Sequence, residues 1–277
     1  MVRRIKPTFF AFILLFALCG LPIADARTQT PKAAKTTAAK SKVKDSYARL
    51  DTFWDDNAPS FAGKRVITVD LIGHGLSDKP DVTYTMDLFA KSVAAVLKHA
   101  GVKRAVLVGH SMGTPVVRQF YRNYPQQTIA LVLVDGALRT FGTPQQMAPM
   151  INAFKGPNYK QVVEQFITTL TRDVASKDEL QHITTAMLAT PQNVIVGGMD
   201  AMVDPTIWKD DPIRVPVLAI YAAGPQWTPD YFQYVHTLVP DIEEQVWDGV
   251  SHFLMMDQPP KFNSAVADFL AKKNLLK

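Results

Sequence analysis

The sequence predicts an α/β fold in which a mostly parallel sheet is covered by helices on both faces and carries a helical lid insertion. Three observations support this prediction. From residue 66 onward, short β-branched or apolar runs alternate with longer segments of helical periodicity. Most of the short runs are continuously apolar, which is typical of strands buried on both faces of a parallel sheet. Residues 139–212 separate the third run from the fourth and are too long for an ordinary connection.

The elements follow in order along the chain. Five strands are expected, at residues 66–70, 105–108, 129–134, 217–221 and 244–247. Core helices are expected at 86–99, 113–124 and 259–272, the first because Leu88, Phe89, Val93, Val96 and Leu97 share one face. Within the insertion, helical periodicity is clearest around 159–172 and 178–189. The core therefore comprises residues 45–138 and 213–277, and the lid comprises residues 139–212.

The first 26 residues have the pattern of a secretory signal peptide. Three basic residues precede an apolar run at 9–18, and Ala24 and Ala26 form a small-x-small cleavage site. The run is too short to cross a bilayer as a helix, so we expect no stable membrane span after cleavage. Cleavage after Ala26 and export, to the periplasm or the medium, are the expectations that follow.

Residues 27–44 are rich in lysine, alanine and threonine and predict a disordered basic tether. The full chain has a net charge of +5, but its first 44 residues hold nine basic residues and one acidic residue. The remainder is mildly acidic, which argues against nucleic-acid binding by the folded part. The single cysteine, Cys19, lies in the leader. An intramolecular disulfide or a thiolate metal cluster is therefore excluded.

A candidate nucleophile follows the second predicted strand. Gly109, Ser111 and Gly113 match G-x-S-x-G where a strand turns sharply into a helix. Such a turn needs glycines because the neighbouring backbone passes too close for a Cβ atom. It would expose the Ser111 hydroxyl above the strand ends, near the positive end of the following helix.

A serine hydroxyl needs a base to take its proton, and the chain has six histidines. His252 follows the last predicted strand, on a loop that would begin at the same edge of the sheet as Ser111. His74 and His110 lie in turns that account for them, and the other three lie in helical or lid patterns. We therefore expect His252 to be the base.

Three segments in this order resemble the α/β-hydrolase superfamily. They are residues 70–80 (DLIGHGLSDKP), the Ser111 turn, and residues 251–253 (SHF) before 257–259 (DQP). The resemblance covers residues 52–275 and is strongest to the branch with lidded esterases, haloalkane dehalogenases and epoxide hydrolases. Dehalogenases and epoxide hydrolases carry an aspartate where this chain has Ser111, so the resemblance implies hydrolysis of a small ester through an acyl-enzyme.

The resemblance leaves two candidates for the acid of the triad. Family members usually place it after the strand at 217–221, where the first carboxylate in this chain is Asp230. Some dehalogenases place it after the preceding strand, where this chain has Asp135. We favour Asp135 because it lies directly at a strand end, although an aspartate there can also serve only to cap the turn into the lid.

The N-terminal part of the family pattern is missing. Relatives have further strands and a His-Gly loop that donates to the oxyanion, whereas residues 45–65 contain neither. The strand missing between 66–70 and 105–108 implies that these two pair directly, that part of 41–52 fills the gap, or that the chain folds poorly. The backbone N–H of Met112 remains as one oxyanion donor, so the alternative function is a catalytically impaired or non-catalytic binding protein.

The lid is expected to supply an apolar acyl pocket from Met147, Met150, Phe154, Tyr159 and Phe166, although such spacing also suits plain packing. No cluster of histidine and carboxylate residues has the spacing of metal ligands, so no metal is predicted. Glycine-rich loops for phosphate or dinucleotide binding are also missing. The sequence therefore predicts no cofactor.

Overall fold

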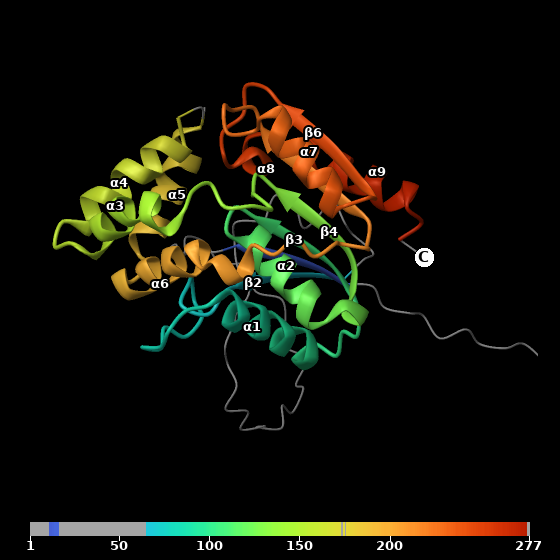
Figure 1. Ribbon diagram of the computed structural model, residues 1–277, viewed down its shortest axis with the longest axis horizontal. Helices are drawn as coiled ribbons and strands as arrows, with labels where there is room; N and C mark the ends of the chain where they lie inside the picture. The colour runs from blue at the N-terminus through green and yellow to red at the C-terminus, as the bar shows by residue number, and fades with distance from the viewer. Residues whose placement is uncertain (1–10, 17–64, 173, 175, 276–277) are drawn as a thin grey trace, which may run out of the picture.

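The computed structural model describes residues 11–16, 65–172, 174 and 176–275. These residues contain a six-stranded parallel sheet with the strand order β2-β1-β3-β4-β5-β6 (Figure 1). The strands are β1 (Ala11–Phe16), β2 (Arg65–Asp70), β3 (Ala105–His110), β4 (Thr128–Val134), β5 (Val217–Ala222) and β6 (Ile242–Trp247). The predicted parallel α/β fold is confirmed.

Five of the strands lie where the apolar runs predict them. β3, β4 and β5 are buried along their full length, which explains why they are continuously apolar. β6 begins two residues before the predicted strand, with Ile242 and Glu243. It is an edge strand in which apolar and polar residues are mixed, so its beginning is not marked by an apolar run.

The gap expected in the sheet is filled by a segment that the sequence analysis assigns to the signal peptide. β1 pairs in parallel with both β2 and β3, so that Leu14 lies opposite Thr68 on one side and Val108 on the other. β2 and β3 therefore do not pair directly, and the strand between them does not come from residues 41–52. The apolar run at 9–18 has the composition of a buried strand as well as of a leader, which is why the sequence does not distinguish the two uses.

Cleavage after Ala26 would remove β1 from the sheet. The predicted cleavage and the observed sheet therefore give residues 11–16 different uses, and export stays a prediction. The cleavage site itself, the tether at 27–44 and the segment 45–64, in which a His-Gly loop is missing, lie outside the described residues.

Helices cover both faces of the sheet, as predicted. On one face, α1 (Met86–His99), α2 (Gly113–Asn123) and α7 (Pro229–Leu238) pack against strand residues such as Leu107. On the other, α8 (Leu254–Asp257) and α9 (Pro259–Lys272) pack against the alternate residues, such as Val106. α7, which carries Asp230 in its first turn, begins after Thr228 because Thr228 caps its N-terminus and Pro229 suits its first turn. Within the described ranges, no helix combines the length and apolar content needed to cross a bilayer.

The insertion forms a lid of helices beside the sheet (Figure 1). Its helices are α3 (Pro144–Lys155), α4 (Tyr159–Leu170), α5 (Lys177–Leu188) and α6 (Gln192–Val203). The periodicity at 159–172 and 178–189 predicts α4 and α5, and it misses α3 and α6. α3 contains Pro149 and α6 contains the pair Gly197 and Gly198, which are residues that disfavour helix in isolation.

Two arginines of α2 hold both ends of the lid. Arg118 is buried and donates to the carbonyl oxygen of Leu138 at 2.6 Å, and it also donates to the carbonyl oxygen of Lys209. Arg122 binds both carboxylate oxygens of Asp211, at 2.6 and 2.8 Å. The chain therefore leaves and rejoins the core against the same helix, which fixes the lid above the carboxyl ends of the strands.

Candidate active site

Ser111 lies on a sharp turn between β3 and α2. Its φ angle is 52°, in the left-handed region that is costly for residues other than glycine. A Cβ atom on Gly109 would lie 2.4 Å from the carbonyl oxygen of Gly113, so the turn requires glycine there. The Ser111 N–H donates to the carbonyl oxygen of Val134 at 2.9 Å, which ties the turn to β4. Met112 occupies the N-cap position of α2, so its backbone lies at the positive end of that helix.

His252 and Asp135 are brought together from positions far apart in the chain. His252 Nδ1 lies 2.6 Å from Asp135 Oδ2, and both side chains are largely buried. Asp135 directly follows β4 with a φ angle of 42°. Its N–H donates to Ile220 O at 2.7 Å, and its Oδ1 accepts from the N–H of Ala222 at 2.9 Å. The carboxylate is therefore oriented from both sides, and it holds the imidazole proton on Nδ1, so that Nε2 is left as the acceptor.

The other candidate acid lies elsewhere. Asp230 is in the first turn of α7, is exposed, and pairs with Arg139 at 2.8 Å. Of the two candidate acids, Asp135 is the one in contact with His252.

Three hydrogen bonds hold the loop that carries His252. Ser251 N–H donates to Asp257 Oδ2 at 2.6 Å, and the Ser251 hydroxyl accepts from the N–H of Phe253 at 3.0 Å. The N–H of His252 donates to the carbonyl oxygen of Leu170 at the end of α4, at 3.3 Å. The position of the imidazole is thereby linked to the lid.

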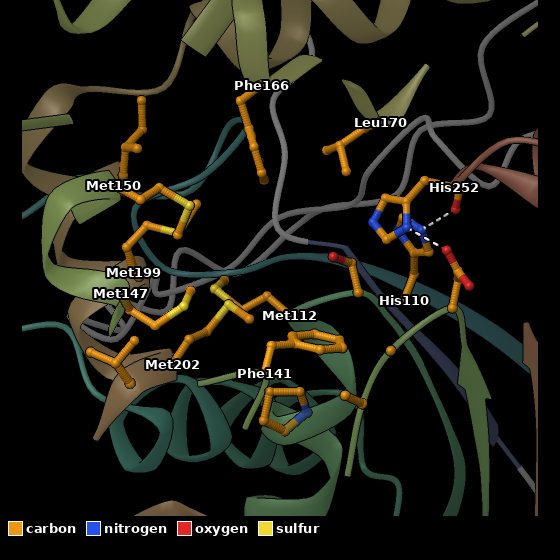
Figure 2. A pocket seen from close by; sticks show the side chains of 18 of the residues that line it. His110, Met112, Phe141, Met147, Met150, Phe166, Leu170, Met199, Met202 and His252 are labelled. Atoms are coloured by element: carbon orange, nitrogen blue, oxygen red, sulfur yellow. Dashed lines mark hydrogen bonds and ion pairs between the residues drawn. The ribbon is translucent and has the colours of Figure 1, made fainter. Parts of the chain in front are cut away.

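His110 is a site residue whose role the sequence analysis misses, because it treats this side chain as part of the turn. Its Nε2 donates to the carbonyl oxygen of His252 at 2.7 Å, and the two rings lie 4.5 Å apart between centroids (Figure 2). Burial, followed by the neighbouring His252, holds the pKa of His110 well below its usual value, so the ring is neutral. The signal that could have identified it is its place directly before Ser111, at the strand end nearest the base loop.

Ser111, Met112, Asp135 and His252 all line one cavity of about 400 Å³ between the strand ends and the lid. Of the five residues expected in an apolar acyl pocket, Met147, Met150, Phe154 and Phe166 line this cavity and Tyr159 is not among the lining residues. Within the described part of the chain, no group of three or more metal-ligating side chains is placed to hold an ion. The cavity thus combines a hydroxyl on a strained turn with an imidazole oriented by a carboxylate, an arrangement suited to nucleophilic attack on a bound substrate.

His74, on the loop after β2, also lines this cavity, and it predicts how stability depends on pH. Burial lowers its pKa from 6.5 to about 4, although its Nδ1–H donates to Ile72 O at 3.2 Å. Between these two pH values the unfolded chain binds the proton and the folded protein does not, so the free energy of unfolding falls as pH decreases from 6.5 to 4. Protonation of His74 in the unfolded chain is expected to lower the free energy of unfolding by about 3 kcal/mol over this pH range.

Urea unfolding of the wild type and His74→Gln at several pH values between 4 and 7 measures this contribution. The variant should lose part of the dependence on pH, while the rest remains because His110 is buried and neutral in the same way. His99→Gln, at an exposed position of α1, is the matched control and should keep the wild-type slope. Equal slopes in His74→Gln and the wild type would contradict the assignment.

Comparison with known proteins relates this site to a large group of enzymes. Residues 45–210 match the family model described as the alpha/beta hydrolase fold. A 2-hydroxy-6-oxononadienedioate/2-hydroxy-6-oxononatrienedioate hydrolase of Paraburkholderia phymatum is 28% identical over 82% of this chain and 81% of its own length.

Two solved structures share the fold. A thermophilic esterase from Thermogutta terrifontis has a TM-score of 0.71 at 19% identity, over 95% of this chain and 90% of its own. An enol-lactonase from Burkholderia xenovorans has a TM-score of 0.72 at 16% identity, over 96% of this chain and 92% of its own. At these identities the likeness concerns the fold.

Proposed function

The chain belongs to the α/β-hydrolase fold family and is a hydrolase of that type. We propose that it is a serine hydrolase that cleaves a small carboxylic ester. One observation carries the proposal. Ser111, on a strained strand-to-helix turn, lines the same cavity as His252, whose Nδ1 is bound by the buried carboxylate of Asp135 at 2.6 Å.

The proposed reaction has two halves. In the first, Ser111 Oγ attacks the ester carbonyl carbon while His252 Nε2 takes the hydroxyl proton. The carbonyl oxygen becomes an oxyanion, for which the N–H of Met112 at the start of α2 is the proposed donor. Collapse of the tetrahedral intermediate breaks the bond to the leaving alkoxide, which receives the proton from His252.

In the second half, water attacks the acyl-enzyme with His252 again as the base. The carboxylic acid product leaves, and the proton returns to Ser111 Oγ. Asp135 keeps its charge throughout and stabilises the imidazolium that forms in each half, because its Oδ2 faces Nδ1 and its Oδ1 is held by the N–H of Ala222.

The cavity does not suit a dioate, the type of substrate named for the relative from Paraburkholderia phymatum. A dioate carries two carboxylates, and no lysine or arginine is found among the cavity-lining residues of the described chain. Burying a charged group without a partner is costly, so the cavity suits an ester with an uncharged body better.

Labelling with a fluorophosphonate, which reacts with activated serines, tests the proposal. We expect the folded wild type to be labelled and Ser111→Ala to show no labelling. Ser264→Ala, at an exposed position of α9, is the matched control and should be labelled like the wild type. The proposal fails if the folded wild type is not labelled, or if labelling persists in Ser111→Ala.

Measurement of ester turnover separates the enzyme from a non-catalytic binding protein. Ester turnover above background that vanishes in both Ser111→Ala and His252→Ala would exclude a purely binding role. Binding of an ester without turnover in the wild type would favour that role instead.

A further inference from the structure

The wall of the active-site cavity is divided into a small polar part and a large apolar part. The polar lining residues are His74, His110, Ser111, Asp135, Thr190, Gln226 and His252. The rest of the wall consists of apolar side chains and glycines, six of them methionines. Beyond Ser111, His110, Asp135 and His252, a substrate therefore meets mostly apolar surface among the described lining residues.

The methionine chamber is defined here by Met112, Met147, Met150, Met187, Met199 and Met202. These side chains come from three lid helices and from the start of α2, so they reach the cavity from several elements instead of forming one stripe. Figure 2 shows Met147, Met150, Met199 and Met202 on the side of the cavity away from His252. Methionine is unbranched, flexible and polarizable, so this wall can adapt to apolar groups of different shape.

Positive charge is kept away from the chamber. Lys155, on α3, pairs with Asp200 on α6 at 3.2 Å, and both side chains are exposed. Arg139, at the beginning of the lid, pairs with the exposed Asp230 at 2.8 Å. Neither cation is among the lining residues.

The two buried histidines at the polar end add no positive charge either. Burial lowers the pKa of His74 to about 4 and holds that of His110 well below its usual value. The carboxylate of Asp135 is the only acidic group of the lining within the described residues, and it already faces His252. A carboxylate carried into the chamber by a substrate would therefore meet the negative charge of Asp135 and no cation among the described lining residues.

We propose that this site is specific for esters with an apolar, uncharged acyl chain, which the methionine chamber binds, and that it rejects acyl chains that end in a carboxylate. This inference rests on the proposed serine hydrolase function and adds its substrate class. The physical reason is the cost of removing a carboxylate from water without a counter-charge, which amounts to several kcal/mol in proteins.

A matched set of chromogenic substrates tests the inference on the wild-type chain. The p-nitrophenyl ester of hexanoic acid and the mono-p-nitrophenyl ester of adipic acid have acyl chains of six carbons and differ at the far end, a methyl group against a carboxylate. We expect kcat/KM at pH 7.5 to be about 10³-fold higher for the hexanoate. The methyl, p-nitrophenyl diester of adipic acid restores neutrality without shortening the chain, and most of the loss should be recovered with it.

A variant pair tests whether charge is the cause. Met150→Lys places a cation at a half-buried position of the chamber, and Met150→Leu keeps the position apolar. Met150→Lys should narrow the preference for hexanoate over adipate by at least tenfold, whereas Met150→Leu should leave it unchanged. A wild-type preference of less than tenfold, or an equal loss with the neutral diester, would overturn the inference.

Two further outcomes distinguish the inference from the proposed function. If fluorophosphonate labels Ser111 but neither hexanoate nor adipate is hydrolysed, the serine hydrolase proposal stands and the substrate class is wrong. If there is neither labelling nor hydrolysis, the proposed function fails and the substrate class fails with it.

Discussion

Replacing Asp135 with asparagine is expected to lower kcat for ester hydrolysis by about 10⁴-fold. The carboxylate accepts a hydrogen bond from the N–H at His252 Nδ1 across 2.6 Å and so leaves Nε2 free to take a proton from Ser111. An amide presents an N–H group to Nδ1 and favours the other tautomer, in which Nε2 carries the proton and cannot act as a base. It also removes the negative charge that stabilises the imidazolium.

The fold should tolerate this change. Asparagine keeps an oxygen that can accept from the N–H of Ala222, as Asp135 Oδ1 does at 2.9 Å. The φ angle of 42° at this position also suits asparagine, which adopts left-handed conformations more readily than most residues. We therefore expect thermal unfolding of Asp135→Asn to remain cooperative, so that the loss of turnover reflects chemistry and not unfolding.

Asp230→Asn is the matched control, because it makes the same chemical change at the other candidate acid. Its carboxylate is exposed and pairs with Arg139, and an exposed ion pair contributes about 0 to 1 kcal/mol. Steady-state kinetics with p-nitrophenyl butyrate should therefore give near wild-type kcat for this variant. A 10⁴-fold loss in Asp230→Asn, or none in Asp135→Asn, would reverse the assignment of the acid.

The position of Asp135 could be predicted because it depends on the regular part of the fold. Parallel strands share one edge for their carboxyl ends, so residues directly after β3 and β4 lie near each other and near the loop after β6. The location of Asp230 could not be predicted equally well. It lies in the first turn of α7, and the start of that helix is set by the Thr228 cap and by Pro229.

The two missed lid helices show where local sequence loses its predictive value. α6 contains Gly197, on which a Cβ atom would lie 2.9 Å from the side chain of Tyr84. The glycine lowers helix propensity but allows α6 to approach Tyr84, which precedes α1. Close packing with a distant segment thus decides the structure, and a sequence window around Gly197 contains no information about Tyr84.

The second large prediction concerns the first strand, β1, which lies in the segment that the sequence assigns to a signal peptide. A chain that starts at residue 27, as cleavage after Ala26 would leave it, is expected to lose its cooperative unfolding transition and its hydrolase activity. β1 is the hydrogen-bonded neighbour of β2 and the link between β2 and the rest of the sheet. Without it, two rows of backbone groups lose their partners, and a stability of the usual 5–15 kcal/mol is too small to absorb this loss.

Loss of β1 would also disturb the active site. The loop after β2 carries His74, which lines the cavity, so detaching β2 opens one wall of the site. Urea unfolding followed by tryptophan fluorescence, together with ester turnover, measures both effects on the same preparation. A chain that starts at residue 9 is the control, since it lacks the basic leader residues but keeps β1 and should behave like the full chain.

If the chain from residue 27 unfolds cooperatively at the same urea concentration as the full chain and hydrolyses esters at the same rate, β1 is dispensable. β2 would then have to pair with β3 directly, and the leader could be removed without damage. If the shorter chain fails as expected, the active protein must retain residues 11–16, so active protein recovered from cells should be larger than the chain that starts at residue 27. Residues 11–16 would then be required in the active protein as the strand between β2 and β3, and the active form would not have been cleaved after Ala26.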